Sequence, residues 1–335
     1  MAITTIAGAL AGMQYPQEFV KAVTPTLVAG RPHSLFYLGG NPVAATAPAP
    51  GIKGAALTSY TGQLPFANPV SGSAYLARIQ AQAVQPGTLL LCDRLWHNSG
   101  LSTTVTTAQV IGNTITSSSV ANPTVITTSA NHPFANGDVV NIQGHTGSTP
   151  AISGSYTISN VTAASFTIPV NVTVGGTGGT VGIALPPRDR DGTIAGAGVF
   201  LGVEVSVATG TGTPTLTVAY TNEVGATGTA TNIVATVATS AIGAFYPIGL
   251  NAGDTGVQTI QSLTLSATWT SGTIHLVAYN VIARLDLPGG NNPNAMDALT
   301  SGFQNMFSNS VPFFIFIPST TTATNVVGHV IYTHG

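Results

Sequence analysis

Charged side chains are scarce in this sequence. Asp, Glu, Lys and Arg together make up 5% of the 335 residues, and the formal net charge at pH 7 is −2. An ordinary soluble domain carries roughly 25% charged residues. The eight basic residues are scattered between Lys21 and Arg284, whereas sequence-independent nucleic-acid binding needs a cluster of basic side chains to displace counterions. We therefore expect no nucleic-acid partner.

Cysteine and long apolar runs are scarce as well. The single Cys92 excludes an internal disulfide framework and a cysteine-based zinc site, and we expect it to be a small buried apolar residue. The longest apolar runs, 89–92 and 311–318, have the length of a strand, whereas a membrane helix needs about 18 or more apolar residues. The N-terminus lacks a basic region followed by an apolar stretch, so we predict neither a secretory signal nor a membrane partner.

Motifs that carry chemistry are also missing. The chain has no G-x-S-x-G elbow, no H-E-x-x-H pair and no phosphate loop followed by Lys and Ser or Thr. We expect no catalytic residue, no metal and no cofactor. Asp93 and His97 could be drawn into a hydrolase triad, but the more economical hypothesis gives Asp93 a structural role, paired with Arg94 or Arg78.

The residues that are abundant favour β-structure. Apolar residues reach 44% of the chain, and apolar and small polar residues alternate in the windows 215–220, 262–269 and 273–281, as half-buried strands do. Gly, Pro and Asn separate such windows at strand-length intervals. The sequence predicts an all-β protein with a jelly-roll-like β-sandwich. Helical spacing occurs only in two short pieces, 17–23 and 294–307, which we interpret as packing elements.

Composition divides the chain into four parts. Residues 1–60, rich in Pro and Gly, predict an extended N-terminal arm whose partners lie outside it. Residues 61–113 and 185–288 predict one sandwich, split by an inserted small β module at 114–184 that ends in a glycine-rich exit. Residues 289–335 predict a C-terminal extension with an interface strand.

The inserted segment has a recognisable pattern. His132, Pro133 and Phe134 are followed by the turn 136–138 (Asn-Gly-Asp) and by an alternating strand, and the stretch 154–168 continues as GSYTISNVTAASFTI. This pattern resembles a small β-barrel insert that recurs in structural proteins of tailed phages and also occurs inside ubiquitin-activating enzymes. The segments 31–40 (RPHSLFYLGG), 87–100 and 185–288 likewise resemble phage virion β-sandwich proteins. The resemblance implies a structural virion protein.

Two features suggest where such a protein would contact its neighbours. The strand-length run 313–317 is apolar on both faces, so it is central in a core or lies in a subunit interface. The run 188–191 is the only charge cluster and predicts a polar turn with ion pairs inside or between subunits, although it faintly resembles a calcium loop that lacks its other ligands. The predicted interface residues are Phe19, Phe36, Trp96, Arg188, Asp189, Arg190, Asp191, Phe313, Phe314 and Phe316.

These observations lead to one hypothesis and two rivals. The hypothesis is a non-enzymatic capsid decoration or cement protein that is made in the host cytoplasm and is located on the virion. It would form a homo-oligomer, a trimer by the symmetry of such shells, and contact the major capsid protein. The first rival is a tail or head-fibre component that binds a host receptor or glycan through exposed aromatics near Trp96, Tyr156 or Phe166. The second is a polysaccharide-acting enzyme using the carboxylates Asp189, Asp191, Glu204 and Glu223.

Overall fold

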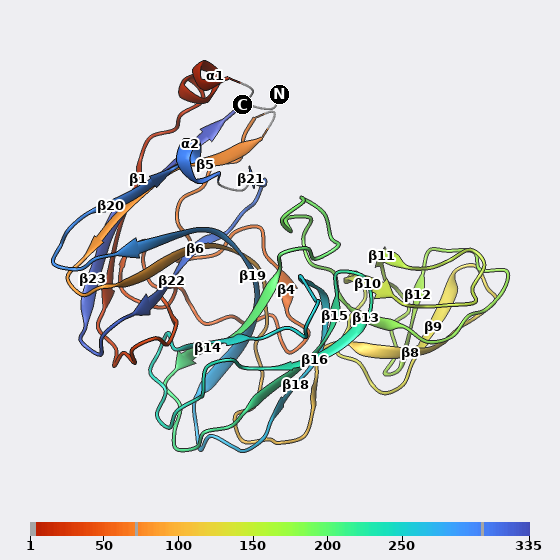
Figure 1. Ribbon diagram of the computed structural model, residues 1–335. Helices are drawn as coiled ribbons and strands as arrows, with labels where there is room; N and C mark the ends of the chain where they lie inside the picture. Colours follow the sequence, from red (N-terminus) through yellow and green to blue (C-terminus); the bar gives the residue numbers. More distant parts are fainter. Residues whose placement is uncertain (1–4, 71–72, 303–304) are drawn as a thin grey trace.

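The computed structural model describes residues 5–70, 73–302 and 305–335. Almost all of its regular structure is β-strand, arranged in four sheets (Figure 1). The predicted all-β, sandwich-like fold is confirmed, and the three alternating windows lie in or overlap long strands. No helix in the described part of the chain is long and apolar enough to cross a membrane.

A seven-stranded sheet, called here the central sheet, forms the middle of the body. Its path is β17-β14-β19-β6-β22-β2, and β4 pairs with the end of β6. Neighbouring strands are antiparallel. The strands are β2 (His33–Ser34), β4 (Ala55–Ala56), β6 (Gly87–His97), β14 (Phe200–Val207), β17 (Phe245–Ile248), β19 (Thr273–Leu287) and β22 (Pro312–Pro318).

A four-stranded sheet packs on one part of the central sheet. Between the two sheets lies a core to which the central sheet contributes Leu201, Val203 and Leu276, and the four-stranded sheet contributes Val218 and Leu263. All five side chains have no exposed surface. The four-stranded sheet follows the order β16-β15-β18-β7 and contains β7 (Gln109–Val110), β15 (Leu216–Asn222), β16 (Thr227–Thr231) and β18 (Val257–Leu265).

A third sheet, the terminal sheet, contains segments from both ends of the chain. A second core joins it to the central sheet, with Phe19 and Ile79 on one side and Leu89, Leu285 and Phe316 on the other. Its order is β20-β5-β23-β1-β3, with β21 also on β5. Its strands are β1 (Gln17–Val23), β3 (Gly40–Asn41), β5 (Ala74–Ala83), β20 (Asn294–Asp297), β21 (Asn305–Met306) and β23 (Thr324–His334).

The two longest strands of the central sheet serve both cores. In β19, Ile274, Leu276 and Ala278 belong to the first core, whereas Leu285 and Leu287 belong to the second. The buried side chains have even residue numbers in the first part of β19 and odd ones in the last part. This change occurs because the pairing with β6 shifts register between Val281 and Ala283. An extra residue at such a bulge moves the following side chains to the opposite parity. One continuous strand can therefore pack against two different sheets.

The helical interpretation of 17–23 is wrong. Gln17–Val23 is β1, which pairs with β23 along its whole length, and its buried residues Phe19, Lys21 and Val23 alternate with more exposed ones. A helix through 294–307 is also wrong for the described residues. There, β20 is followed by the short helix α2 (Ala298–Ser301) and then by β21. Residues 303–304 lie outside the described chain. Both short strands, β20 and β21, pair through their backbones with β5.

The strands β8 to β13, which lie between β7 and β14 in the sequence, form a sheet of their own. Six strands follow the order β11-β10-β13-β8-β9-β12 around a separate apolar core, and the unit projects from one side of the body (Figure 1). The predicted turn at 136–137 is present, and Gly137 adopts φ 86° there. The strands are β8 (Asn113–Ser118), β9 (Thr124–Thr128), β10 (Val139–Gln143), β11 (Gly154–Thr157), β12 (Ser165–Ile168) and β13 (Thr180–Ile183).

Segments near both ends of the chain contribute strands to the body. β1 sits between β23 and β3, so residues 17–23 of the proposed arm are part of the terminal sheet. The short helix α1 (Ile6–Ala11) precedes it and has no buried residue. From the segment 289–335, for which we expected an interface strand, β22 lies between β6 and β2, and β23 lies between β5 and β1. For the residues before β1, an arm that contacts other subunits stays a prediction.

The projecting unit begins and ends on neighbouring strands, which makes its removal testable. Asn113 pairs with Val181 across β8 and β13, and paired strands lie about 5 Å apart. We expect a variant in which a short Gly-Ser linker joins Asn113 to Val181 to fold and unfold cooperatively. Its denaturant m-value should be smaller, because less surface is exposed on unfolding. Loss of a cooperative transition in this variant would contradict an independently folded insert.

Candidate functional site

Most of the predicted interface residues are packed inside the chain itself. Eight of the ten are at most 2% exposed, whereas Arg190 and Asp191 are exposed. Phe314 and Phe316 point into the second core, and Phe313 packs with Phe36 in a smaller cluster on the other face of the central sheet. The strand with two apolar faces thus has both faces covered by its own chain. A contact with another subunit through these residues stays a prediction.

One buried ion pair joins distant parts of the chain. The guanidinium of Arg188 donates to both carboxylate oxygens of Asp93, at 2.9 and 3.3 Å. It also donates to the carbonyl oxygens of Leu57 and Arg94. Asp93 additionally accepts hydrogen bonds from Ser310 Oγ and from the backbone N–H of Val311. The pair therefore connects the N-terminal segment, β6, the return from the projecting unit and the start of β22.

The expected pairing of Asp93 with Arg94 or Arg78 is wrong. Successive side chains of a strand point to opposite faces, so Asp93 and Arg94 diverge into different surroundings. Arg78 lies in the terminal sheet, where it donates to Gln80. Arg188 was singled out from the sequence for its charge cluster, yet nothing local in the sequence links it to a residue 95 positions earlier.

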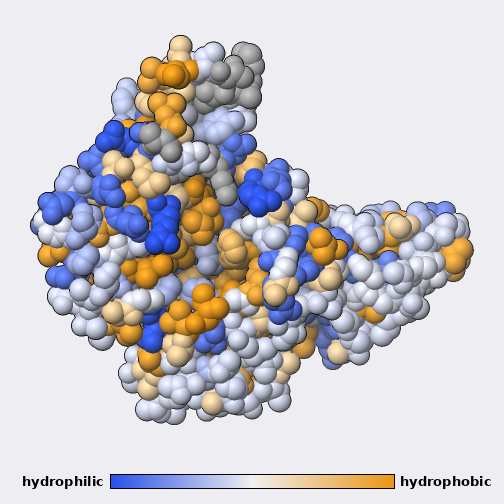
Figure 2. Space-filling view, viewed as in Figure 1, coloured by the Kyte–Doolittle hydropathy of each residue, from blue (hydrophilic) through white to orange (hydrophobic). Residues whose placement is uncertain are grey.

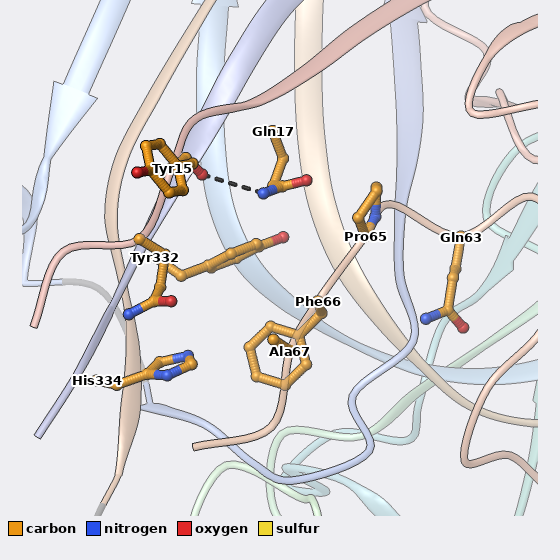
Figure 3. Close-up of a pocket in the computed structure, with 9 residues that line it drawn as sticks. Tyr15, Gln17, Gln63, Pro65, Phe66, Ala67, Tyr332 and His334 are labelled. Atoms are coloured by element: carbon orange, nitrogen blue, oxygen red, sulfur yellow. Dashed lines mark hydrogen bonds between the residues drawn. The ribbon is translucent and has the colours of Figure 1, made fainter. Parts of the chain in front are cut away.

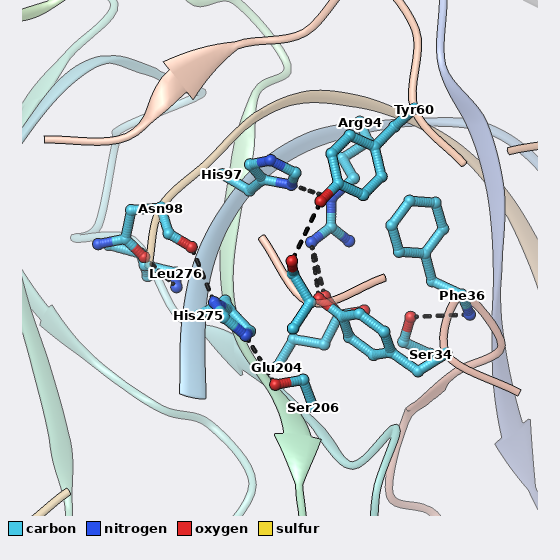
Figure 4. Close-up of polar contacts among 12 residues, drawn as sticks. Ser34, Phe36, Tyr60, Arg94, His97, Asn98, Glu204, Ser206, His275 and Leu276 are labelled. Atoms are coloured by element: carbon cyan, nitrogen blue, oxygen red, sulfur yellow. Dashed lines mark hydrogen bonds and ion pairs between the residues drawn. The ribbon is translucent and has the colours of Figure 1, made fainter. Parts of the chain in front are cut away.

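A second buried ion pair forms on the other side of β6. Arg94 Nη2 lies 2.7 Å from Glu204 Oε2, and neither side chain has exposed surface (Figure 4). The guanidinium carbon also lies 4.4 Å from the centre of the Phe36 ring. Burial alone would lower the pKa of Arg94, but the negative charge of Glu204 and the contact with Tyr37 raise it above its ordinary value. Arg94 and Glu204 thus form a buried, charged pair between β6 and β14.

The histidines around this pair are neutral. His97 Nδ1 accepts a hydrogen bond from Arg94 Nε, so its proton lies on Nε2. Burial, the charge of Arg94 and the nearby His275 lower the pKa of His97 to about 2. Burial also lowers the pKa of His275, whose ring contacts the carbonyl oxygen of Asn98 and Ser206 Oγ (Figure 4). These rings extend the polar network without adding charge.

The carboxylate of Asp189 organises the loop that follows Arg188. It accepts from the backbone N–H groups of Asp191, Thr193, Gly196 and Ala197 and from the hydroxyl of Thr193. These donors occupy the oxygens that a cation would need, so the faint likeness to a calcium loop reflects a polar turn. The exposed pair Arg190–Asp191 has its two charged groups 3.4 Å apart.

The other carboxylates proposed for an enzyme are also held by the chain. Glu204 is buried against Arg94, and Glu223 Oε2 accepts from the backbone N–H of Gly256. Sequence reasoning missed two Ser–His pairs: Ser206 with His275, and Ser118 with His145, at 2.7 and 2.9 Å. Each histidine also contacts a backbone carbonyl. All four side chains are buried, so these pairs fit a structural role.

Four of the eight basic and three of the ten acidic side chains lie in the interior. Lys21, Arg31, Arg94 and Arg188 are buried, which leaves four of the eight basic side chains at the surface. Lys21 has only the carbonyl oxygens of Leu38 and Pro42 as partners, and burial lowers its pKa to about 8. Among the described residues, no three His, Cys, Asp or Glu side chains are grouped so that they could hold a metal ion.

Comparisons with known proteins give little information. No protein-family model matches the chain, and no curated protein matches it either. Among solved structures, a subviral particle of infectious bursal disease virus VP2 is 10% identical over 81% of this chain and 83% of that chain, with a TM-score of 0.14. A structure of the Gx strain of the same virus is 10% identical over 96% of this chain and 81% of that chain, with a TM-score of 0.13. Scores this low support no conclusion about function, so the proposals below rest on the chain's own residues.

The Asp93–Arg188 pair should dominate stability. We expect Arg188→Met to lower the free energy of unfolding by about 3 to 5 kcal/mol, because it leaves a buried carboxylate without its cation. Arg190→Met, two residues away in an exposed pair, should change it by less than about 0.5 kcal/mol. Chemical denaturation of both variants measures the difference. Equal effects would show that Arg188 does not connect the segments as described.

The neutral histidines predict a loss of stability in acid. Burial lowers the pKa of His33 to about 4 and that of His97 to about 2, from 6.5. Below pH 6.5 the unfolded chain therefore binds protons that the folded chain excludes. The free energy of unfolding should fall as the pH drops from 6.5 towards 4, by up to about 1.4 kcal/mol per pH unit for each histidine. Denaturation curves across this range test the slope, and His97→Gln should reduce it; an unchanged slope would contradict a neutral His97.

Proposed function

We propose that this chain is a non-enzymatic structural protein of a virus particle, which works by packing against copies of itself and against other subunits. The observation that carries the proposal is the distribution of charge. Four basic side chains remain on a surface of 12749 Å², because the others lie inside. Charge repulsion is the ordinary obstacle to association between protein surfaces, and this surface has little of it.

The exposed apolar residues support the same proposal. The helix α1 buries none of its side chains, and Ile6 and Leu10, one turn apart, are 63% and 60% exposed. Met13 follows and is also exposed. Figure 2 shows apolar surface at this end of the molecule. A helix that buries no side chain among the described residues is suited to an apolar partner on a neighbouring subunit, so we assign the arm contact to α1.

The finer proposal is a capsid decoration or cement protein. The arm would lie on a neighbouring subunit or on the major capsid protein, the body would form a trimer around a local three-fold axis, and the projecting unit would face outward. The resemblance of segment 132–168 to an insert of phage structural proteins supports a phage particle. The surface of the projecting unit is of mainly intermediate hydropathy (Figure 2), which suits exposure to solvent.

The contribution of α1 to association can be isolated. We expect the full-length protein to sediment as an oligomer and the double variant Ile6→Ser, Leu10→Ser to sediment with a larger monomer fraction, because it loses exposed apolar surface and no buried side chain. The matched control is Val224→Ser, Ile233→Ser, whose parent side chains are 78% and 68% exposed. Sedimentation velocity over a range of protein concentrations provides the measurement. A chain that stays monomeric at every concentration would refute self-association.

The place in the particle requires a different experiment. An antibody raised against the projecting unit, residues 114–182, should label the heads of particles purified from cells that produce this chain. Labelling of tails would instead support a tail component, and the absence of labelling from every particle would refute a virion role. Electron microscopy of negatively stained particles distinguishes these outcomes.

A further inference from the structure

A pocket lies beside the end of the terminal sheet, near α1. It has a volume of about 380 Å³ and is bordered by the segment after α1, the loop 63–67 and the last residues of β23 (Figure 3). Among the described residues, no Lys, Arg, Asp or Glu lines it. A volume above about 300 Å³ is in the range of small-molecule sites. An uncharged lining selects against ionic ligands, which would lose their hydration without gaining a counter-charge.

Aromatic rings form part of the wall. Phe66 meets the ring of Tyr332 edge-on, with 5.1 Å between ring centres, and lies 6.4 Å from the ring of His334. Tyr15 stands at the rim and is 89% exposed. An exposed aromatic ring beside a pocket offers a flat apolar face together with a hydroxyl. These groups suit a ligand that has an apolar face and several polar edges.

Two polar atoms of the wall lack hydrogen-bond partners among the described residues. Tyr332 is 2% exposed, its hydroxyl makes no hydrogen bond, and it points toward the space between Gln17, Pro65 and Phe66 (Figure 3). His334 Nε2 is buried and also has no partner. A buried polar atom without a partner costs about 1 to 3 kcal/mol. Burial raises the pKa of Tyr332 well above its ordinary value, so its hydroxyl is protonated and can donate.

Three glutamines complete the set. Gln14 Nε2 donates to the carbonyl oxygen of Gly12, and Gln17 Nε2 donates to that of Tyr15. Gln63 Oε1 accepts from the backbone N–H of Tyr60. Within the described chain, each amide is thus held in place through one atom, while its other atom is free to bind a ligand. The pocket therefore offers two fixed amide acceptors, one fixed amide donor and the tyrosine hydroxyl.

We propose that this pocket binds a neutral saccharide unit. Hydroxyl groups that both donate and accept match the amides of Gln14, Gln17 and Gln63 and the hydroxyl of Tyr332. The C–H face of a pyranose ring matches the exposed ring of Tyr15. The site lies away from the aromatic residues that the sequence suggested for glycan binding, of which Trp96 and Phe166 are at most 1% exposed. The binding is independent of the proposed role in assembly.

The test uses the full-length protein and four probes: the methyl glycosides of glucose, galactose, mannose and N-acetylglucosamine. Saturation-transfer NMR should detect binding of at least one probe, and titration calorimetry should give a Kd on the order of 1 mM or lower. Tyr15→Ala should weaken that binding by about tenfold, because it removes the stacking face. Tyr332→Phe should weaken it to a similar extent, because it removes a hydroxyl that donates to the ligand.

Matched controls separate binding from folding. Tyr156→Phe removes a hydroxyl from the projecting unit and should leave the Kd unchanged. Tyr332→Phe should unfold at the same temperature as the parent protein or higher, because the hydroxyl it loses has no partner in the described part of the chain. The proposal is overturned if no probe binds at about 20 mM, or if a bound probe is unaffected by both pocket substitutions.

Discussion

The fold depends on one ion pair that is shielded from water. Asp93 and Arg188 bring together four stretches that are far apart in the sequence: the segment at Leu57, strand β6, the return from the projecting unit, and the start of β22. Without this pair, only loops would connect these four stretches where they are not paired in a sheet. Because both groups are almost fully buried and each has further hydrogen bonds, neither can leave its partner without a large penalty. The pair therefore fixes how the chain re-enters the body after the insert, and β14 and β22 can align on the same central sheet.

The interior use of charge explains the character of the surface. Two ion pairs and the loop around Asp189 take up charged residues that an ordinary domain would present to solvent. What remains outside is mostly small hydroxyls, amides and backbone, together with 19 large apolar side chains that are exposed in the described part of the chain and the four basic and seven acidic side chains that are not buried. Such a surface is soluble but repels its own copies weakly. The proposed assembly role and the proposed saccharide pocket both follow from it, because each involves neutral contacts: apolar side chains at α1 in one case, and amides with aromatic rings in the other.

The sequence predicted a strand well where apolar and polar residues alternate over many positions. It predicted poorly which residues each strand contacts. The windows around Tyr220 and Tyr279 alternate over enough residues to exclude a helix, and Asn136-Gly137 identifies its own turn. The seven residues of β1 were misread as a helix because Phe19 and Val23 are four positions apart, a spacing that fits both a helix and a strand. The burial of Lys21 between them identifies the strand. The sequence does not reveal that burial. The partner of Asp93 was missed because it is set by the path of the whole chain. The pocket at Tyr332 was missed because its walls come from both ends of the sequence.

The bulges of β6 and β19 have a mechanical consequence. Because each strand runs without interruption through both sandwiches, a pull on one sandwich passes along the covalent backbone of β6 and β19 to the other. No hinge loop lies on this path to absorb it. Under load, the two sandwiches would therefore move together as one stiff unit.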